Sequence, residues 1–496
     1  MREYIPYISG LIDGVIEGLS FLLPEFVLTL AFLLSIFSGI FLKGKSIVTW
    51  WITFLGILFA GIFTMTQLVA PALKPVLFGM IWPDTNGLLL KLLIGVVCLL
   101  FCVFVYYNHA LRSHNKRIDD LLSVLLVIHI GLNLTVTAVN WLMVYIAIEM
   151  ISVGSYILVG YLSKDNKQSE AALKYVLFGA VCSAIMLYGL SLFYGYTGSL
   201  CFIESTHLSG LIAMPPLVFT VAVLFVFTGI GFKLSFVPFH FWSPDVYQGA
   251  PTPITAFLST APKVAVIGLL ARFVMAWPNI MESTLPPLIF YTLAAAAVSS
   301  MLVGNLVAIR QSNVKRIMAY SSIGHTGFLL MIVLADADQA FSVLFYFLTV
   351  YVIMNMGVFM LADYLEEKLG LTDVVQYQGV GKSYPVVMTA MTIFMISLIG
   401  LPPTGGFVAK LLSFSAVFNA YQNRADLVWL VLLMVGALTT VVALFFYFKI
   451  PLNAFLRESK RSFPKKPING MLVTAFLLAI LILLLGVFPS LLLAVV

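Results

Sequence analysis

Runs of about 18–25 mostly apolar residues follow one another along this 496-residue chain, and each is long enough to cross a lipid bilayer as a helix. Apolar and aromatic residues make up 61% of the chain and charged residues only 10%, which excludes an ordinary water-soluble protein. A transmembrane β-barrel would instead show short strands with alternating apolar and polar residues. The sequence therefore predicts an all-α polytopic membrane protein.

Charges, Pro, Gly or Asn bound these runs and predict about fourteen transmembrane helices. We expect them near residues 21–41, 47–68, 88–107, 122–138, 140–162, 172–195, 216–236, 252–276, 286–309, 315–334, 340–364, 384–414, 427–448 and 470–494. The longest polar connection, around 449–467, is too short to form a soluble domain.

Two of the predicted helices are interrupted. The seventh passes through Gly229, Gly231 and Lys233 into Pro238, and the twelfth through Gly-Leu-Pro-Pro-Thr-Gly-Gly at 400–406 before it resumes at Phe407. Such breaks are tolerated only where the backbone lines a polar cavity or is buried in protein.

The two breaks lie five helices apart, so that equivalent helices would run in opposite directions. This spacing predicts two inverted five-helix repeats, each with one broken helix. We expect four parts: a three-helix segment over 1–121, the repeats over 122–276 and 286–448, and a connecting loop with a C-terminal helix over 449–496.

The loop lysines and arginines predict the orientation. With both termini outside, eighteen of them lie in inner loops, whereas the outer side has only Arg2, Lys74, Arg272 and Arg424. Basic residues concentrate on the inner side of membrane proteins. The net charge of +6 therefore reflects loop topology and does not indicate nucleic-acid binding. The first twenty residues contain Asp13 and Glu17 and no cleavable small-residue site, so we expect the first helix itself to direct insertion.

Charged residues inside the apolar runs are the strongest functional signal. A charge at the bilayer centre costs about 3 kcal/mol or more, so each needs a partner or a function. One acid, Glu149, lies about midway along the fifth run, and five lysines lie within or at the edge of the runs: Lys91, Lys174, Lys233, Lys263 and Lys410.

Two of these lysines have a structural explanation. Lys91 lies at the start of its helix and is expected to extend its side chain to the headgroups. Lys174 lies near the inner end of its helix, where this explanation and a functional role are equally open. Glu25 follows Pro24 in a first helical turn, where an acid complements the helix dipole.

The other charges are too deep for that explanation or lie beside a break. Glu149, Lys233, Lys263 and Lys410 are therefore candidate functional residues, and the structural alternative is an ion pair between Glu149 and Lys233. At least two lysines lack a carboxylate in the spans. Desolvation favours the neutral amine, which accepts protons.

The histidines divide into three groups. His240 and His325 lie at the first break and in the tenth helix, where an imidazole can bridge lysines with a group that titrates near neutral pH. His129 is expected to be a core imidazole bonded to a carbonyl. The remaining ones are expected at the surface: His109, His114 and His207.

No metal or cofactor site is evident. No pair of histidines repeats on one helix to hold a haem. The four cysteines lack the close spacing of a zinc or iron–sulfur site and are expected to be small core residues: Cys98, Cys102, Cys182 and Cys201.

Four motifs carry a family resemblance. The stretch 231–263, GFKLSFVPFHFWSPDVYQGAPTPITAFLSTAPK, resembles the signature of the subunit N family of respiratory complex I. The segments KRIMAYSSIGH at 315–325, IGLPPTGGFVAK at 399–410 and IAIEM at 146–150 are similar to other motifs of that family. The resemblance extends over nearly the whole chain.

Three features favour subunit N over other antiporter-like subunits. The stretch VYQGAPTP at 246–253 resembles the N version, Lys410 stands where subunit M typically has a glutamate, and the chain ends soon after its last helix, without the lateral helix of subunit L.

The resemblance implies that this chain is a non-redox, proton-translocating subunit of a membrane-bound NADH-quinone oxidoreductase. The expected site residues are the family's glutamate and lysines together with two histidines of less settled role: Glu149, Lys174, Lys233, Lys263, Lys410, His240 and His325. NADH, flavin, iron–sulfur clusters and quinone are implied in partner subunits, with none bound by this chain. The expected location is a bacterial inner (plasma) membrane or an organellar inner membrane.

Two alternatives remain open. A subunit of a sodium/proton antiporter complex would be expected to offer several oxygen ligands for sodium, whereas these spans are rich in lysine. A scaffold would use its buried charges only to fix helix packing. Proton-coupled exchange in vesicles separates a transporter from a scaffold.

Overall fold

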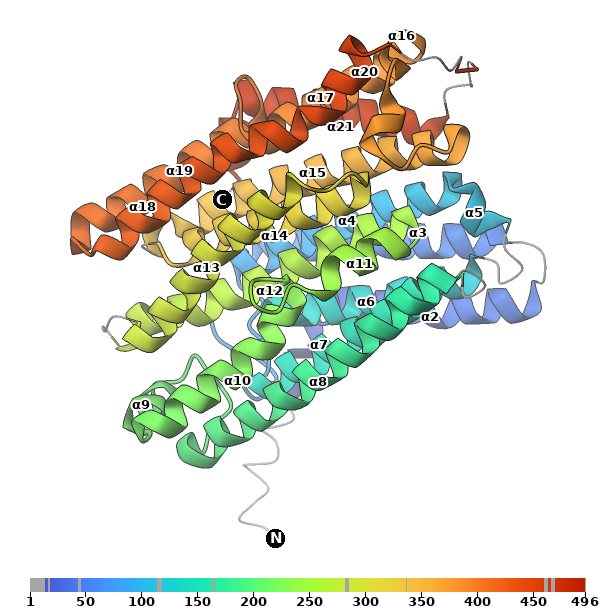
Figure 1. The fold of residues 1–496 in the computed structure, drawn as a ribbon. Helices are drawn as coiled ribbons and strands as arrows, with labels where there is room; N and C mark the ends of the chain where they lie inside the picture. Colours follow the sequence, from blue (N-terminus) through green and yellow to red (C-terminus); the bar gives the residue numbers. More distant parts are fainter. Residues whose placement is uncertain are drawn as a thin grey trace.

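The structure, a computed structural model, describes residues 14–16, 18–42, 46–113, 118–162, 166–281, 285–335, 337–458, 463–464 and 469–495. Within these ranges the regular secondary structure is helical, apart from isolated β-bridges in the connections. The helices form a bundle whose long elements run side by side (Figure 1). The prediction of an all-α architecture is confirmed.

The helices follow the apolar runs of the sequence. Their bounds are α2 Leu23–Phe41, α3 Ser46–Val69, α4 Thr85–Tyr107, α5 His109–Arg112, α6 Asp119–Thr137, α7 Trp141–Val159, α8 Asn166–Thr197, α9 Ser205–Ala213, α10 Pro216–Leu234, α11 Trp242–Gly249, α12 Thr252–Met281, α13 Pro287–Ala308, α14 Val314–Val333, α15 Ala337–Leu369, α16 Val380–Ser383, α17 Pro385–Ile399, α18 Gly405–Arg424, α19 Leu427–Tyr447, α20 Lys449–Leu456, α21 Gly470–Val487 and α22 Ser490–Leu493. A short 3₁₀ helix, η2, covers Val374–Tyr377.

Thirteen helices in the described ranges are long and apolar enough to cross a membrane, and α17 is a shorter apolar helix. The predicted twelfth span is divided between α17 and α18. Every predicted apolar run therefore contains a helix of the structure.

Burial separates central helices from peripheral ones. The apolar windows of α12, α14 and α15 are 100%, 89% and 94% buried, whereas those of α2, α8 and the α19–α20 span are about one third buried or less. Large apolar side chains on the peripheral helices face outward, as expected where lipid replaces water as the solvent. The central helices are thus shielded from lipid by the rest of the bundle.

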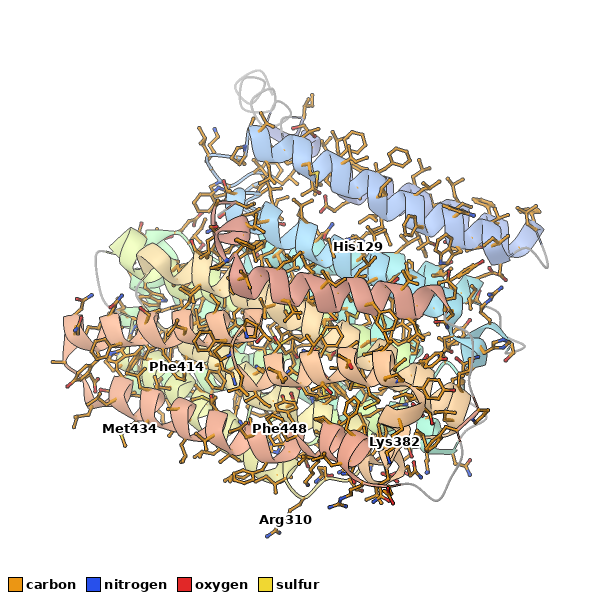
Figure 2. The ribbon with its side chains drawn as sticks, turned by 90° about the horizontal axis from the view of Figure 1, so that it is seen from above. His129, Arg310, Lys382, Phe414, Met434 and Phe448 are labelled. Atoms are coloured by element: carbon orange, nitrogen blue, oxygen red, sulfur yellow. The ribbon has the colours of Figure 1, made fainter. Side chains whose placement is uncertain are left out.

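The N-terminal helices pack as a pair at one edge. α2 contacts α3, and both contact α6; Figure 2 shows the pair in blue along the edge of the bundle. α4 lies between this pair and the central helix α12.

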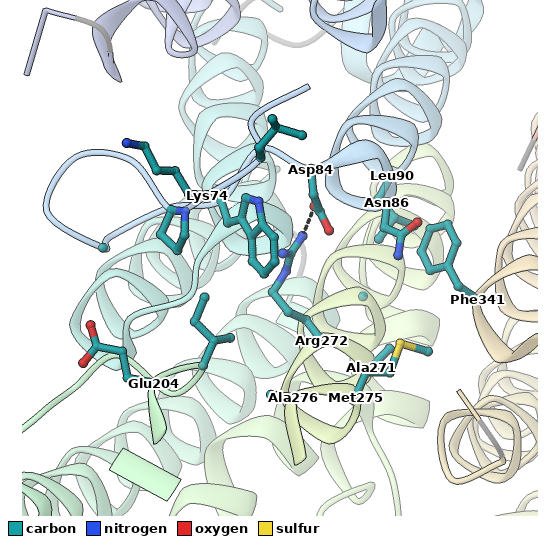
Figure 3. A pocket seen from close by; sticks show the side chains of 16 residues that line it. Lys74, Asp84, Asn86, Leu90, Glu204, Ala271, Arg272, Met275, Ala276 and Phe341 are labelled. Carbon is teal, nitrogen blue, oxygen red and sulfur yellow. Dashed lines mark hydrogen bonds and ion pairs between the residues drawn. The ribbon is translucent and has the colours of Figure 1, made fainter. Parts of the chain in front are cut away.

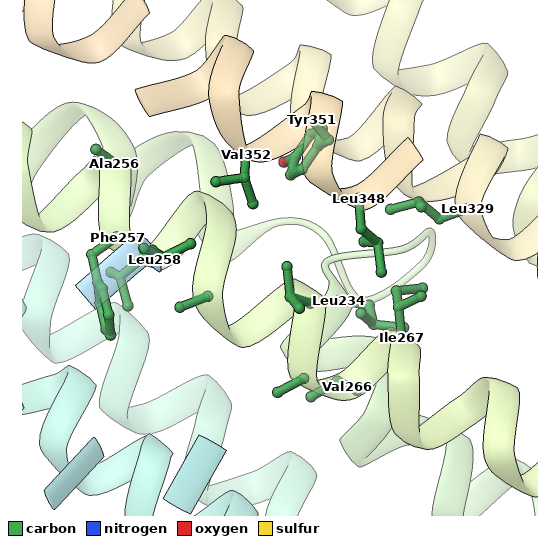
Figure 4. Close-up of a cluster of buried hydrophobic side chains, with 14 of the residues drawn as sticks. Leu234, Ala256, Phe257, Leu258, Val266, Ile267, Leu329, Leu348, Tyr351 and Val352 are labelled. Carbon is green, nitrogen blue, oxygen red and sulfur yellow. The ribbon is translucent and has the colours of Figure 1, made fainter. Parts of the chain in front are cut away.

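Apolar side chains fill the region where α10 ends against the central helices. Leu234 of α10, Ile267 of α12 and Leu348 of α15 are fully buried there, and Figure 4 shows them facing one another. Burial of such side chains excludes water from around them, so a polar group in this region depends on protein partners or on water held in polar cavities.

Both predicted helix breaks are present. α10 ends at Leu234, Ser235 adopts a left-handed conformation with φ 57°, and the chain resumes as α11 at Trp242. α17 ends at Ile399, Gly400 has φ 89°, and α18 begins at Gly405, two residues before the predicted restart. The inverted repeats and the four-part division of the chain stay predictions.

Candidate functional site

Lys233 lies in the last turn of α10 and is buried, with 4% of its surface exposed. Its Nζ has no hydrogen-bond partner among the described residues. Three rings surround the ammonium position, with centroids 5.8 Å from Nζ: those of Tyr156, Tyr175 and Phe232. The faces of aromatic rings attract a cation but cannot accept its protons as a carboxylate does.

Glu149 lies near the middle of α7, and its Oε1 accepts a hydrogen bond from the Ser183 hydroxyl of α8. No ion pair joins Glu149 to Lys233 within the described structure. The alternative of a direct Glu149–Lys233 pair is therefore wrong for this conformation, because the carboxylate bonds to the neighbouring helix α8.

Lys263 lies on the fully buried helix α12 and is 1% exposed. Its Nζ donates to Thr326 Oγ1 at 2.7 Å and to the Ser322 carbonyl at 2.9 Å, both on α14. Thr326 Oγ1 also lies 3.1 Å from the carbonyl oxygen of Leu234, the last residue of α10. The hydroxyl of Thr326 thus connects Lys263 to the first helix break.

Lys410 lies on α18, just after the second break, and is 5% exposed. Its Nζ donates to the carbonyls of Leu398 at 3.2 Å and Ile399 at 2.7 Å, at the end of α17. The last carbonyls of a helix lack partners within it and carry the negative end of the helix dipole. The break therefore supplies the oxygens that hold this ammonium.

His325 lies on α14 and is buried, directly before Thr326, whose hydroxyl binds Lys263. Its Nε2 is 3.5 Å from the Tyr447 hydroxyl, and its Nδ1 has no hydrogen-bond partner among the described residues. The predicted role of His325 as a bridge between lysines stays a prediction.

His240 occupies the connection between α10 and α11. It is buried, its ring packs on Phe241, and its Nδ1 has no hydrogen-bond partner within the described ranges. Burial lowers the pKa of His240.

Lys174 stands apart from the buried lysines. Its side chain is 39% exposed, and it pairs with Glu170 at 2.8 Å and with Asp245 of α11 at 2.7 Å. Arg316 binds the other oxygen of Asp245 at 2.8 Å. Burial raises the pKa of Asp245, but the hydrogen bonds from Lys174 and Arg316 outweigh this effect and leave it below its usual value.

Lys91 is the clearest correction to the sequence analysis. It was expected to extend to the headgroups, but it is 2% exposed and pairs with Glu25 at 2.7 Å. A carboxylate on α2 satisfies the ammonium inside the bundle, so it has no need to reach the surface. Glu25 is in the first turn of its helix, as expected, and also serves as this partner.

Two histidine predictions also need correction. His207 was expected at the surface but is fully buried; Trp141 Nε1 donates to its Nε2 at 3.2 Å. His129 is a core residue, as expected, but its Nδ1 has no hydrogen-bond partner among the described residues, so the predicted bond to a carbonyl is not made by that nitrogen. His109 is exposed, and His114 lies outside the described residues.

The four cysteines are buried and unpaired, as predicted. Within the described part of the chain, no cluster of His, Cys, Asp or Glu is arranged to hold a metal ion.

Hydroxyl groups are the part of the site that sequence reasoning missed. Ser183 holds Glu149, Thr326 holds Lys263, and Tyr447 faces His325. Ser and Thr are common in membrane helices, where they often bond their own backbone. The one available signal was Thr326, which directly follows His325 in the sequence.

A cavity at the other end of α12 is not lined by any of the buried lysines Lys233, Lys263 or Lys410. It measures about 720 Å³, lies near the start of α4 and the second half of α12, and contains an ion pair between Arg272 and Asp84 at 2.5 Å. Figure 3 shows this pair in the middle of a mainly apolar lining. The cavity therefore does not mark the lysine site.

Comparisons with known proteins agree with the fold and the motifs. Residues 138–456 match the family described as NADH:quinone oxidoreductase/Mrp antiporter, TM. NADH-quinone oxidoreductase subunit N 2 of Chloroherpeton thalassium is 37% identical over 482 residues, which cover 96% of this chain and 93% of that protein. Subunit N of Chlorobium chlorochromatii is 36% identical over 456 residues, covering 91% and 88%.

Two solved structures share the architecture. A chain of respiratory complex I from Thermus thermophilus superposes with a TM-score of 0.77 at 27% identity, covering 95% of this chain and 99% of that one. A chain of the archaeal membrane-bound sulfane sulfur reductase gives a TM-score of 0.82 at 24% identity, with 96% of each chain covered. The second likeness concerns the fold alone.

Proposed function

Because this chain belongs to the NADH:quinone oxidoreductase/Mrp antiporter transmembrane family, and within it to subunit N of NADH-quinone oxidoreductase, we propose that it translocates protons. The proposed path follows the buried lysines at the middle of the membrane, from Lys233 through Lys263 and His325 to Lys410. Lys174 and His240 are proposed to serve the entrance of this path.

One observation carries the proposal. Lys233, Lys263 and Lys410 are all 5% exposed or less, and none pairs with a carboxylate within the described residues. Buried charges without counter-ions are costly in a membrane protein and are retained where they transport ions. An amine that changes protonation avoids part of that cost and passes a proton onward.

Glu149 is proposed to gate the path by moving between two partners. In the present arrangement it bonds to Ser183, and Lys233 is unpaired. If it moved to within 4 Å of Lys233, the ammonium would gain roughly 4 kcal/mol at an effective dielectric constant of about 20. Moving one charge through 100 mV takes about 2.3 kcal/mol, so opening and closing this pair is sufficient to drive a proton against such a potential.

The energy is proposed to come from partner subunits of the complex. Electron transfer would take place there, with NADH, flavin, iron–sulfur clusters and quinone bound outside this chain. The sodium/proton antiporter alternative is not favoured, since the relatives above are subunits of NADH-quinone oxidoreductase.

The lysine path is tested by Lys263→Met, measured as proton transport per electron pair in vesicles that contain the assembled complex. We expect a loss of about tenfold or more, since a positioned proton-transfer group contributes at least that much. Lys382→Met is the control, because Lys382 forms only an exposed ion pair with Glu458. Normal transport in the assembled Lys263→Met complex would refute the proposed path.

The chain is further proposed to lie in a bacterial inner membrane with both termini outside. A reporter that is active only in the cytoplasm should then be active when fused within residues 450–467 and inactive at the C-terminus. The reverse pattern would overturn this orientation.

A further inference from the structure

A second polar region lies at the inner ends of the central helices, as the proposed orientation defines them. It is a cavity of about 440 Å³ lined by residues of several helices and their connections. Its carboxylates are Asp363, Glu366, Glu367 and Asp373. None of them belongs to the lysine path described above.

The carboxylates of this cavity are held in different ways. Glu366 pairs with Lys315 at 3.0 Å and accepts from the Thr252 hydroxyl at 3.0 Å. Asp363 is 4% exposed and has no ion pair within the described structure; both of its oxygens accept from Asn108 Nδ2 at 3.0 Å. Asp363 is therefore a buried carboxylate without a cation in direct contact, at the wall of a polar cavity.

Unsatisfied polar atoms point to water in this cavity. Gln168 lines the cavity and is 8% exposed. Its Oε1 atom has no hydrogen-bond partner among the described residues, and neither does Oε2 of Glu367, which also lines the cavity. Buried polar atoms of this kind are normally satisfied by ordered water, and the cavity is large enough to hold several molecules.

Polar side chains continue from the cavity toward Lys263 along three central helices. On α12 they recur at intervals of three or four residues, which places them on one face of a helix: Thr252, Thr255, Ser259 and Lys263. On α15 a similar series is Tyr351, Asn355, Asp363 and Glu366, with Phe359 between them. On α14 the series is Lys315, Ser322 and Thr326.

Hydrogen bonds join these series near Lys263. The Tyr351 hydroxyl donates to the Ser259 carbonyl at 2.8 Å and lies 2.7 Å from the Ser322 hydroxyl. The Ser322 carbonyl in turn accepts from Lys263.

Two further unsatisfied atoms lie beside the polar series of α15. They are Asn355 Oδ1 and Tyr247 OH, both without a hydrogen-bond partner in the described structure. The ring of Tyr247 is 6.5 Å from that of Phe359, which places it beside the polar series of α15. Positions for bridging water therefore extend from the cavity toward Lys263.

We infer that this cavity is a proton-loading vestibule, in which Asp363 takes protons from water on the inner side and supplies them to Lys263. The inference rests on the proposed function and adds an entrance that bypasses Lys233. Hydronium gives its proton to the Asp363 carboxylate and becomes water. The acid then releases that proton through the hydroxyl and water positions to the neutral amine of Lys263, which becomes an ammonium.

The carboxylate is tested by Asp363→Asn, which keeps the size of the side chain and one acceptor for Asn108. We expect proton transport per electron pair to fall several-fold, less far than in Lys263→Met because the entrance through Lys233 remains, with the complex still assembled. Asp363→Glu, which keeps a titratable group, should restore most of the transport, and Glu458→Gln should have no effect because that carboxylate is exposed on a surface pair. Normal transport in Asp363→Asn, together with loss in Lys263→Met, overturns the vestibule but leaves the lysine path intact.

Access from the inner side is tested with Gln168→Cys in inverted vesicles, whose outer surface is the inner side of the membrane. A cationic methanethiosulfonate reagent should label this cysteine and reduce proton transport. The wild-type chain is the control, because its Cys182 lies on the same helix but is buried away from the cavity. Failure to label Gln168→Cys from this side would overturn the inference, whatever the effect of Lys263→Met.

Discussion

Each helix break is accompanied by a buried lysine, and the two lysines differ in their hydrogen-bond partners. Lys410 is held by two carbonyls at the end of α17, whereas Lys233 has no hydrogen-bond partner in the described structure. Both lysines are buried. Lys233 lies just before Ser235, the left-handed residue that ends α10, whereas Lys410 lies in the first half of α18, after Gly400, the left-handed residue that ends α17. The difference therefore comes from the order of lysine and break along the chain.

Lys410 follows its break and reaches back to the helix before it. The carbonyls of Leu398 and Ile399 are free for its ammonium because no backbone N–H continues α17. The ammonium thus donates the hydrogen bonds that the backbone N–H groups of a further helical turn would otherwise supply.

Lys233 precedes its break, and the neighbouring carbonyls are already engaged. The carbonyl of Gly231 accepts a hydrogen bond from the Phe236 N–H, and the carbonyl of Phe232 accepts one from Trp242 Nε1. The carbonyl of Leu234 accepts a hydrogen bond from the Thr326 hydroxyl. A lysine in this position depends on a mobile partner such as Glu149. Under the proposed function, Lys410 would be a fixed proton site and Lys233 a switchable one.

The largest effect is expected when either lysine is removed. Lys233→Met and Lys410→Met should each lower proton transport per electron pair about tenfold or more. They should differ in stability: Lys410→Met leaves two buried carbonyls without a donor, at a cost of about 1–3 kcal/mol each, whereas Lys233→Met removes an unpaired charge and orphans no hydrogen bond.

Vesicle transport and thermal unfolding of the purified complex measure these two properties. Equal losses of stability in the two variants would contradict the distinction between a held lysine and a free one. Lys382→Met provides the exposed control in both measurements.

An intermediate effect is expected when the switch is removed but the lysine is kept. Glu149→Gln should lower proton transport several-fold, since Lys233 then lacks the carboxylate that changes its proton affinity. Adding Lys233→Met should give a complex that assembles normally but does not pump. If the double variant recovered nearly wild-type pumping, the pair would have only a structural role.

The smallest effect on transport is expected for the ion pair of Lys91 and Glu25, because this buried lysine has a carboxylate partner. Glu25→Gln should destabilise the protein by about 3–5 kcal/mol, because it leaves Lys91 buried without its counter-ion. Transport per assembled complex should stay near the wild-type value. The double variant with Lys91→Met should regain stability, and a loss of transport in that stable double variant would place Lys91 on the proton path.

The sequence was sufficient to predict the helices and the two breaks. The length of an apolar run and the positions of Pro and Gly are local properties of the sequence. They predict the spans directly, because the thickness of the bilayer sets the length of a helix and the lack of water requires its backbone to be hydrogen-bonded. The predicted helix bounds are less accurate: α18 begins at Gly405, whereas the sequence analysis expected Phe407. The candidate lysines Lys233, Lys263 and Lys410 were also correctly predicted to be buried.

The partners of these residues were not predictable in the same way. Lys91 and Lys233 look alike in the sequence, each a lysine in an apolar run, yet one is paired with Glu25 and the other has no hydrogen-bond partner among the described residues. An ion pair between Glu149 and Lys233 was the structural alternative that their charges suggested, but in the structure Glu149 accepts a hydrogen bond from Ser183.

The sequence by itself thus determined which segments form apolar helices, where two of them break and which apolar runs contain a lysine. The tertiary structure alone decided what each charge contacts. Glu25 and Lys91 are 66 residues apart in the chain, and their meeting depends on how deeply and at what rotation two helices pack. Hydropathy fixes the depth of a helix in the bilayer to within a turn, but a hydrogen bond requires its two atoms to lie within about 3 Å.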